Sequence, residues 1–541
     1  MADSSPASPI SQPNLWDRRD LFLALGIALF TLVIYTRVLA PDILYSDSGE
    51  FQTLAYTWST THTTGYPVYL IYARIIGLIP ISTLAWRINF ASAVAAAVTV
   101  GGVYLIGRSF TKSVGALIGS LVLLISYTFW SQAVMTEVYT SSTMFIVMVL
   151  LALLIWHARP AKRGWVLFLA GFLVSVGLGV HLSLILIAPA AFLFVLYGVV
   201  VGPPEERRHW KHLAVLIAGG SAGLLTFYLL FVYMDMRPTP TNMFTTSIVP
   251  SRDAWGLTEA DLSNEPERFW ISVSGRQWRD RMIPDDVDYQ KTITDFLNVD
   301  LAREFALPTL LLAILGAVSA LIWQRQLFVL IGAGLIVTFA AGLFYFPPDK
   351  YLFYLPFYVL LSVMTGVGAG FLATWITRIV PAVIPHAIPA VIVTVILVVI
   401  CFVPFINTRW KAIQLGRSTF VAEDYAYPVN SPDEPRRAAE CALSKVPESD
   451  ALLVLNWRAL YSIYYVAHVE QRRTGIIIHE AQPYPTQVVV QSLIDELTAR
   501  LSKGEAVYVD SAYNPLRNFF TLTPITNSCK DYNLYKMSLK S

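Results

Sequence analysis

Residues 21–40 read LFLALGIALFTLVIYTRVLA, twenty residues of which Arg37 alone carries a charge. A helix of about this length crosses the roughly 30 Å hydrocarbon core of a bilayer. The preceding Arg18 and Arg19 could mark a signal peptide, but no small-residue cleavage site follows the apolar stretch. We therefore interpret it as a first membrane span that is retained.

Ten further apolar stretches follow the first one. They cover residues 86–107, 113–130, 135–156, 164–179, 181–201, 213–235, 305–323, 327–346, 351–375 and 386–407. Of the 541 residues, 55% are hydrophobic and 14% are charged, a balance typical of proteins that reside in lipid. The sequence therefore predicts a polytopic α-helical membrane protein with about eleven transmembrane helices between residues 21 and 407. Gly177, Gly179 and His181 interrupt the stretch 164–201, so a re-entrant pair with the same parity stays open there.

The basic residues between these stretches set the orientation. Under the count of eleven, the short basic connections all fall on one side, and positive residues mark the cytoplasmic side. They carry Arg18, Arg19, Arg108, Lys112, Arg159, Lys162, Arg163, Arg207, Arg208, Lys211, Arg325 and Arg378. The sequence thus predicts a disordered cytoplasmic segment at 1–20, outer loops at 41–85 and 236–304, and an extracytoplasmic tail at 408–541. Short loops and a compact tail favour a bacterial plasma membrane over an internal eukaryotic membrane.

The tail has the pattern of a small α/β domain. Residues 451–455, 475–478 and 506–509 are short β-like runs, and 488–501 has helical periodicity. Cys441 and Cys529 lie in this tail, where a disulfide can form if the compartment is oxidising. Two cysteines alone do not establish that bond.

Charge and ligand spacing argue against some classes of function. The chain has 39 basic and 37 acidic residues, a net charge of +2, and it has no basic run, so we expect no nucleic-acid partner. One Asp/Glu pair without a His/Asp cluster of metal-ligand spacing gives no reason to predict a bound metal. We predict no cofactor; a divalent cation that binds transiently stays open.

The first predicted outer loop begins with two carboxylates, since residues 45–52 read YSDSGEFQ. If a helix starts here, Asp47 and Glu50 share one face because they are three residues apart. The same spacing fits a capping box, with Asp47 as the N-cap and Glu50 reaching back to it. On spacing alone, the capping interpretation is the stronger of the two.

The same loop continues THTTGYPVY at 61–69, where Gly65 and Pro67 shape a turn. His62 and Tyr66 are therefore close in sequence to the two acids. A lone histidine is more often a surface or hydrogen-bonded structural residue than a catalytic one, but these neighbours favour a functional role.

This loop resembles a known family. The stretch 47–51 (DSGEF) with His62 and Tyr66-Pro67 is similar to the signature loop of membrane proteins long grouped under a domain of unknown function, which are related to the eukaryotic transmembrane O-mannosyltransferase of plexin-type receptors. TEVY at 136–139, VSGRQ at 273–277 and DKYLFYLP at 349–356 agree in order, and 453–465 is similar to the tail of bacterial members. The chain departs from the family in having Thr63 and Thr64 where two prolines are usual.

The resemblance implies a GT-C-like fold, in which the first outer loop holds a catalytic acid and the donor is a polyprenyl-phosphate sugar. Such a donor carries its own leaving group, so one base near the acceptor hydroxyl suffices. Asp47 is the expected base, and Glu50 is expected to hold acceptor or sugar hydroxyls. The displacement would invert the anomeric centre of a hexose, mannose in the eukaryotic relative. The acceptor would be a hydroxyl of a protein, a glycan or a lipid.

The later stretches that match the family supply further candidates. Arg276 and Lys350 are basic residues suited to the departing phosphate or, equally, to lipid headgroups. Glu137 lies at the outer end of a predicted span, where an unpaired carboxylate is costly and a place in a site wall is favoured. The expected substrate-binding residues are His62, Tyr66, Glu137, Tyr139, Arg276, Asp349, Lys350 and Tyr351.

Two other classes of function compete with a transferase. A transporter or flippase suits eleven spans with a glycine-interrupted pair, although the sequence has no inverted repeat and its acids lie in an outer loop. A receptor needs far fewer spans. Loss of sugar transfer in Asp47→Asn separates the enzyme from both, whereas a capping role predicts a cost of about 1 kcal/mol.

Overall fold

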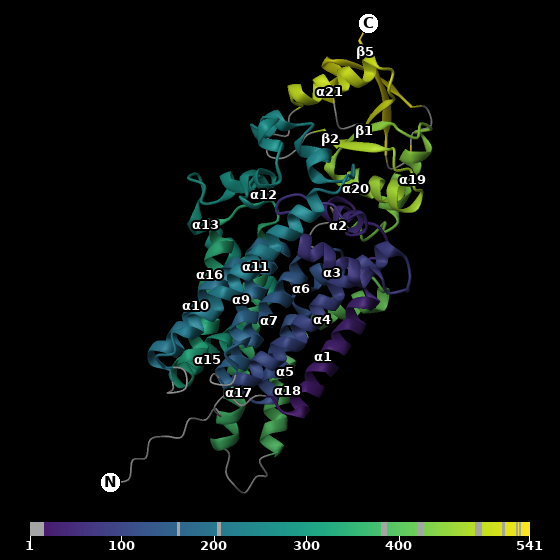
Figure 1. The fold of residues 1–541 in the computed structure, drawn as a ribbon. Helices are drawn as coiled ribbons and strands as arrows, with labels where there is room; N and C mark the ends of the chain where they lie inside the picture. Colours follow the sequence, from purple (N-terminus) through teal and green to yellow (C-terminus); the bar gives the residue numbers. More distant parts are fainter. Residues whose placement is uncertain are drawn as a thin grey trace, which may run out of the picture.

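The computed structural model describes residues 16–159, 163–202, 207–379, 387–418, 426–481, 489–510, 514–525, 529 and 532–540. The disordered segment predicted at 1–20 falls mostly outside these residues. The described chain forms a bundle of long helices with a small domain that contains a sheet at one end (Figure 1). The described residues begin at residue 16 in the bundle and end at residue 540 in the small domain.

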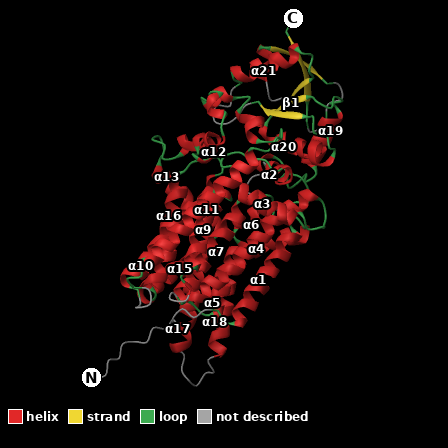
Figure 2. Ribbon diagram, viewed as in Figure 1, coloured by secondary structure: helices red, strands yellow, loops and turns green. Residues whose placement is uncertain are grey.

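The bundle is built from apolar helices, which Figure 2 shows in red. They are α1 (Arg18–Arg37), α4 (Leu84–Phe110), α5 (Ser113–Ile125), α6 (Tyr127–Ala133), α7 (Tyr139–Ala158), α9 (Val166–Val176), α10 (Ala188–Val201), α11 (Lys211–Asp235), α15 (Leu307–Trp323), α16 (Arg325–Phe344), α17 (Leu355–Ile379) and α18 (Ala387–Leu415). Large apolar side chains such as Phe22 and Ile336, 71% and 72% exposed, cover their outer surface. Exposed apolar surface on this scale is suited to lipid and not to water.

The number of spans differs from the prediction. Within the described residues, eight helices are long and apolar enough to cross a membrane, and two bent pairs bring the total to ten. The remaining predicted span, 164–179, is the fifth in chain order. It corresponds to the apolar helix Val166–Gly179, which is shorter than the others. A polytopic helical membrane protein is therefore confirmed, but the count of eleven is not.

Glycines permit close contacts between the spans. A Cβ atom at Gly115 of α5 would overlap the carbonyl oxygen of Gly366 in α17, and one at Gly171 of α9 would overlap that of Leu216 in α11. In membranes, where lipid is as apolar as leucine, small residues at such crossings let helix backbones pack closely.

Short helices from two loops lie between the bundle and the small domain (Figure 1). From the first loop come α2 (Ser46–Thr57) and α3 (Pro67–Gly77). The second loop contributes η3 (Phe244–Ile248), η4 (Arg252–Trp255), η5 (Ala260–Leu262), α12 (Glu265–Val273), η6 (Arg276–Arg281), α13 (Tyr289–Asp295), η7 (Phe296–Asp300) and α14 (Leu301–Glu304). Two more short helices, η2 (Leu182–Ile187) and η8 (Lys350–Tyr354), precede α10 and α17. The two loops predicted to share one side of the membrane thus gather at one end of the bundle.

The small domain, called the tail domain below, is an α/β unit, as predicted. Its five strands are β1 (Leu452–Leu455), β2 (Ile477–Glu480), β3 (Val507–Asp510), β4 (Phe520–Pro524) and β5 (Leu534–Leu539), in the order β2-β1-β3-β5-β4. β1 runs parallel to β2 and β3, whereas β5 pairs antiparallel with β3 and β4. The helices of this domain are α19 (Glu434–Ser444), α20 (Trp457–Tyr464) and α21 (Gln491–Ser502).

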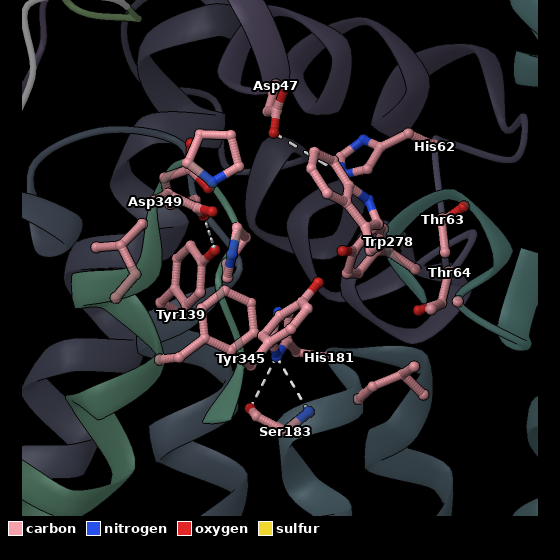
Figure 3. Close-up of a pocket in the computed structure, with 18 of the residues that line it drawn as sticks. Asp47, His62, Thr63, Thr64, Tyr139, His181, Ser183, Trp278, Tyr345 and Asp349 are labelled. Carbon is pink, nitrogen blue, oxygen red and sulfur yellow. Dashed lines mark hydrogen bonds and ion pairs between the residues drawn. The ribbon is translucent and has the colours of Figure 1, made fainter. Parts of the chain in front are cut away.

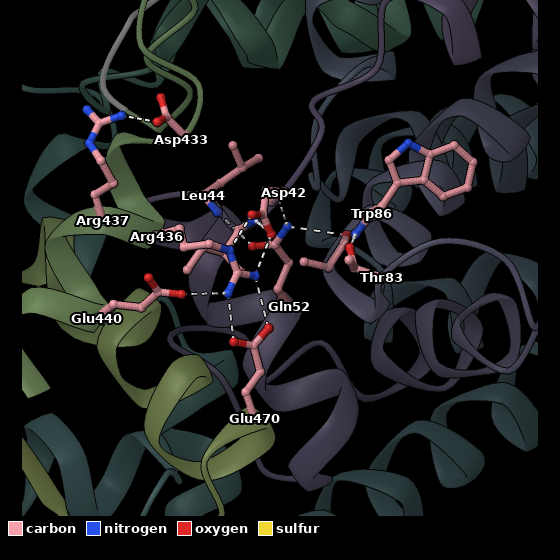
Figure 4. A network of polar contacts seen from close by, with 12 residues as sticks. Asp42, Leu44, Gln52, Thr83, Trp86, Asp433, Arg436, Arg437, Glu440 and Glu470 are labelled. Atoms are coloured by element: carbon pink, nitrogen blue, oxygen red, sulfur yellow. Dashed lines mark hydrogen bonds and ion pairs between the residues drawn. The ribbon is translucent and has the colours of Figure 1, made fainter.

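The tail domain is fixed to the first loop by a charged network (Figure 4). Arg436 of α19 is paired with Asp42 of the first loop, with a second contact of 2.7 Å between its Nη2 and Asp42 Oδ1. The same guanidinium donates to both carboxylate oxygens of Glu470, at 2.7 and 2.9 Å, and to Glu440 at 3.3 Å. Bidentate contacts of this kind fix orientation as well as position.

Two cysteines of the tail domain are joined covalently. Cys441 of α19 and Cys529, between β4 and β5, form a disulfide that closes a loop of 88 residues. Closing a loop of this length restricts the unfolded chain and stabilises the domain.

Candidate active site

A cavity of about 970 Å³ lies where the bundle, the first loop and the tail domain meet. Its acidic or amide-bearing lining residues are Asp47, Gln132, Glu137, Asp349, Asn456 and Glu480. Its apolar lining includes Ile185, Phe344, Met282 and Ile283, of which the Ile283 backbone N–H donates to the Phe344 carbonyl at 2.9 Å. Those four side chains are also 53%, 41%, 51% and 68% exposed, so the cavity reaches the outer surface along an apolar flank.

Helix α2 carries the two acids of the first loop, but neither acid caps it. The N-cap is Tyr45, and no side chain makes a capping hydrogen bond there. The capping-box interpretation of Asp47 and Glu50 is therefore wrong. Gly49 lies between them, where a Cβ would lie 2.5 Å from the carbonyl oxygen of Leu44 and 3.3 Å from the backbone nitrogen of Ser462 in α20.

His62 lies between the two carboxylates. Its Nδ1 donates to Glu50 Oε2 at 2.5 Å, and its Nε2 is 3.8 Å from Asp47 Oδ2 (Figure 3). Both acids therefore face the same ring, as their three-residue spacing predicted. Burial opposes the charged imidazole, but the Glu50 and Asp47 carboxylates outweigh it and raise the pKa of His62 to about 9.

The turn after His62 returns this residue to α2. The Gly65 backbone N–H donates to the His62 carbonyl at 2.7 Å, and Gly65 has φ +84°, a left-handed conformation that favours glycine. Thr63 and Thr64, where the family usually has prolines, line the cavity beside this turn (Figure 3).

The two acids differ in access to the cavity. The Asp47 side chain is 43% exposed and lines the cavity, whereas Glu50 is completely buried behind His62 and does not line it. Glu50 accepts hydrogen bonds from both the backbone N–H and the ring of His62. Burial raises the pKa of Glu50, although contact with His62 counteracts that effect. The expected contact between Glu50 and substrate hydroxyls is thus not available in this arrangement.

The tail domain contacts Asp47 directly. Trp457 Nε1, at the start of α20, donates to Asp47 Oδ1 at 2.7 Å, and the indole is 5.9 Å from the His62 ring in a T-shaped arrangement. Ser46 Oγ also donates to Oδ1, at 3.2 Å. Asp47 Oδ1 is therefore held by two donors, whereas Oδ2 lies toward His62.

Glu137 and the Tyr139–Asp349 pair lie deeper in the cavity. Tyr139 Oη donates to Asp349 Oδ2 at 2.6 Å (Figure 3), and Ser48 Oγ donates to Glu137 at 3.2 Å. Burial, together with the nearby carboxylates of Asp47 and Asp349, raises the pKa of Glu137 well above its ordinary value. Glu137, Tyr139 and Asp349 all line the cavity, as does Tyr351.

His181 lines the cavity, although it was not among the predicted site residues. The Ser183 backbone N–H donates to His181 Nδ1 at 3.1 Å, so this nitrogen is an acceptor and the ring proton is on Nε2. The ring packs against Tyr66 and Tyr139, with centroid distances of 6.1 and 5.1 Å. Tyr66 also lines the cavity, so its predicted place beside the acids agrees with the structure.

The two expected phosphate-binding cations are placed differently. Lys350 does not line the cavity: its Nζ donates to the Leu343 carbonyl at 3.2 Å and lies 3.4 Å from the centre of the Phe346 ring. Arg276 begins η6 directly after Gly275, a cavity residue, and its side chain is outside the described part of the structure. In the part of the chain that the structure describes, no group of three or more His, Cys, Asp or Glu side chains is arranged to hold a metal ion.

Several cavity residues were not predicted as site residues. Asn456, Trp457 and Glu480 come from the tail domain, and Trp278 and Tyr345 flank the middle of the cavity. For Trp457, the signal was the stretch 453–465, which resembles bacterial members of the family. Trp278 lies directly after the matching stretch 273–277, and Glu480 lies outside every stretch that resembles the family.

Comparisons with known proteins agree with this architecture. Residues 47–200 match the model of the "Protein O-mannosyl-transferase TMEM260 N-terminal domain". Protein O-mannosyl-transferase TMEM260 of Mus musculus is 23% identical over 224 residues, which cover 41% of this chain and 31% of the mouse protein. The match thus spans about a third of the length of that relative.

Two solved structures share the fold over nearly the whole chain. ArnT from Cupriavidus metallidurans, bound to undecaprenyl phosphate, superposes with a TM-score of 0.58 at 14% identity and covers 95% of this chain and 97% of its own. The Archaeoglobus fulgidus oligosaccharyltransferase gives a TM-score of 0.52 at 12% identity, over 92% of this chain and 70% of its own. At these identities the likeness establishes the fold alone.

The helix bundle and the α/β tail share the fold of these two solved structures, which is the GT-C-like fold that the resemblance implied. Residues 47–200, which comprise the first loop and the spans that follow it, are similar to the N-terminal domain of the TMEM260 protein O-mannosyltransferase family. The resemblance predicted from the DSGEF loop is thereby confirmed.

Proposed function

We propose that this protein is a membrane glycosyltransferase that moves a hexose from a polyprenyl-phosphate donor to the hydroxyl of an acceptor protein. One observation carries the proposal: a single cavity combines an apolar flank, open at the bundle surface, with a polar lining that includes Asp47 and His62. A lipid-linked sugar has the same division into an apolar chain and a polar head. The solved ArnT structure is bound to undecaprenyl phosphate, and the mouse relative is a protein O-mannosyltransferase, which supports this donor and acceptor.

In the proposed reaction, Asp47 is the general base. The acceptor oxygen forms a bond to the anomeric carbon while the bond from that carbon to the phosphate oxygen breaks, and the acceptor proton passes to Asp47. Polyprenyl phosphate leaves, and the anomeric centre inverts. Asp47 Oδ2 is the oxygen available for the proton, because Oδ1 already accepts hydrogen bonds from Trp457 and Ser46.

His62 is the cation that we place near the departing phosphate. Its raised pKa keeps the ring protonated at neutral pH, and it lines the cavity beside Asp47. A positive charge in a site of low polarity stabilises negative charge that develops on a leaving group. Arg276 stays a proposed phosphate partner because of its position after Gly275, whereas Lys350 is directed elsewhere.

Glu50 acts in this proposal as a positioning residue. It does not touch the cavity, but it holds the ring and backbone of His62 and favours the protonated imidazole. Tyr66, Glu137, Tyr139, Asp349 and Tyr351 form the wall against which the sugar would bind.

We propose that the site and the tail domain are extracytoplasmic, in a bacterial plasma membrane. The Cys441–Cys529 disulfide supports this placement, because disulfides persist on oxidising sides of membranes. The basic connections predicted to be cytoplasmic agree with it.

The proposal is tested by transfer of radiolabelled hexose from polyprenyl-phosphate mannose and polyprenyl-phosphate glucose to membrane extract. Purified wild type should transfer one of these sugars, and Asp47→Asn should lower turnover by about 100-fold to 10,000-fold, the usual contribution of a positioned base. Asp433→Asn, the same change at an exposed aspartate of the tail domain, is the matched control and should keep wild-type turnover. Failure of wild type with every donor would refute the transferase and favour a transporter or flippase.

A further inference from the structure

The parallel strands of the tail domain end at the cavity. β1 lies between β2 and β3 and is parallel to both, so the carboxyl ends of the three strands share one edge of the sheet. From β1 the chain continues to β2, which lies on one side of β1, and then to β3, which lies on the other side of β1. In open α/β sheets, such a change of direction leaves a ligand-binding crevice beyond the carboxyl ends of the two strands that flank it, here β1 and β3.

Residues at this edge line the cavity. Asn456 and Trp457 follow β1 directly, and Glu480 is the last residue of β2. The corresponding residue of β3, Asp510, is engaged within the domain, because it accepts hydrogen bonds from the Asn456 backbone N–H at 3.0 Å and the Tyr532 hydroxyl at 2.9 Å. The ends of β1 and β2 therefore remain for a ligand.

The two strand ends offer a ligand different hydrogen-bonding groups, the amide of Asn456 and the carboxyl of Glu480. The side-chain oxygen of Asn456 accepts from the Arg458 backbone N–H at 2.8 Å, which leaves its amide NH2 group to donate. Glu480 is only 6% exposed, and its carboxyl interacts with the Ser247 side chain and with the charges of Glu50, Asp47 and His62. Burial raises the pKa of Glu480 to about 7, so near neutral pH its carboxyl can donate as well as accept. A carbonyl next to a hydroxyl, as in a peptide, suits this pair.

The charge of the cavity selects among acceptors. Asp47, Glu137, Asp349 and Glu480 line it, whereas no described arginine or lysine side chain does. A carboxylate on the acceptor would meet the charge of Asp47 and the ionised fraction of Glu480 in a partly desolvated site, and such contacts are costly. The only described cation near Asp47 in the cavity lining is His62, which Glu50 already engages.

On the proposed function, the donor lipid occupies the apolar flank, and the tail-domain edge is left for the acceptor. We propose that Asn456, Trp457 and Glu480 form the acceptor subsite, and that it takes a serine or threonine hydroxyl of an extended polypeptide segment with no acidic side chain beside that hydroxyl. Trp457 supplies an aromatic surface for the acceptor, and its Nε1 hydrogen bond orients Asp47. The same tryptophan therefore contacts both the acceptor and the base.

The test uses three synthetic threonine peptides of equal length whose neighbours of the threonine are alanine, lysine or aspartate. Full-length wild type should use the alanine and lysine peptides with kcat/KM about tenfold above that of the aspartate peptide. Glu480→Gln should raise KM for the alanine peptide and reduce the discrimination against aspartate. The affinity of the variant for polyprenyl phosphate, measured by protection against thermal unfolding, should equal that of wild type.

Glu505→Gln is the matched control, because Glu505 is an exposed glutamate of the same domain, paired with Arg500 at 2.9 Å. It should keep both the peptide KM and the discrimination. Equal use of the three peptides together with a wild-type KM in Glu480→Gln would overturn the subsite. Donor turnover with sugar passed only to water or to a glycoside would refute a polypeptide acceptor, whereas no donor turnover at all would refute the proposed function itself.

Discussion

Glu50→Gln isolates the electrostatic role of a buried residue that does not line the cavity. In wild type the His62 backbone N–H donates to Glu50 Oε1 at 2.8 Å. Gln can still accept this hydrogen bond, so the loop should keep its shape. The variant removes the carboxylate that lies 2.5 Å from His62 Nδ1. Without it, burial is opposed only by the Asp47 and Glu137 carboxylates, and the pKa of His62 should fall from about 9 to about 7 or below.

The size of the effect follows from the pKa of His62. The difference between about 9 and the ordinary value of 6.5 corresponds to about 3 kcal/mol, at 1.36 kcal/mol per pKa unit. Because the folded-state pKa is the higher one, this stabilisation is fully present below pH 6.5. It is lost as the pH rises through about 9. Wild-type stability and turnover should therefore both decline near pH 9.

The assay is initial donor turnover as a function of pH, with thermal unfolding recorded in the same buffers. The alkaline limb of wild type should lie near pH 9, and that of Glu50→Gln should move to about 7 or below. Glu137→Gln is the matched comparison, because Glu137 contributes less than Glu50 to the pKa of His62, so its alkaline limb should move much less. An alkaline limb in Glu50→Gln that coincides with that of wild type would refute the reasoning.

Three further substitutions probe the junction with the tail domain. Trp457→Phe removes the 2.7 Å hydrogen bond to Asp47 but keeps an aromatic ring; steady-state kinetics should show kcat lower by about 10-fold to 100-fold and an unchanged donor KM. Gly49→Ala places a Cβ 2.5 Å from the Leu44 carbonyl oxygen and should cost about 1–3 kcal/mol in thermal unfolding. Cys441→Ser opens the 88-residue loop and should cost about 4 kcal/mol, an effect that a reductant reproduces in wild type.

Each of these substitutions has a matched control. Tyr461→Phe removes a hydroxyl one turn further along α20 and should leave kcat unchanged. Gly26→Ala adds a Cβ with no atom within 4 Å and should not destabilise the protein. Cys401→Ala removes the free cysteine and should leave the sensitivity to reductant unchanged. If a control variant showed the same effect as the substitution with which it is paired, the structural explanation given for that substitution would be wrong.

Hydropathy predicted the membrane class and most of the spans, because the amount of apolar surface is a local property of the sequence. It could not show where spans break. The stretch 113–130 was predicted as a single span, but it bends by 66° between α5 and α6. Glu304 holds the break, since it accepts from the Ser126 hydroxyl at 2.6 Å and the Thr128 backbone N–H at 3.0 Å. No local pattern links residues that are 178 positions apart.

The acids of the first loop and His62 could be found from the sequence because they lie within sixteen residues of one another. Helical spacing correctly put Asp47 and Glu50 on one face of α2, but it does not say which residues that face meets. The structure turns Glu50 toward His62 and away from the cavity, which changes its expected role. Trp457 and Glu480 reach the site only through tertiary packing of the tail domain.

The hydrogen bond between Asp47 and Trp457 joins residues that are 410 positions apart. At ribosomal rates of about 5–20 residues per second, Asp47 is made and inserted roughly 20 to 80 seconds before its partner exists. A nascent or truncated chain can therefore fill the membrane with helices while its base still lacks the indole that orients it. On the proposed function, a chain that lacks the tail domain would have an Asp47 without this hydrogen bond and should turn over its donor more slowly than the complete protein.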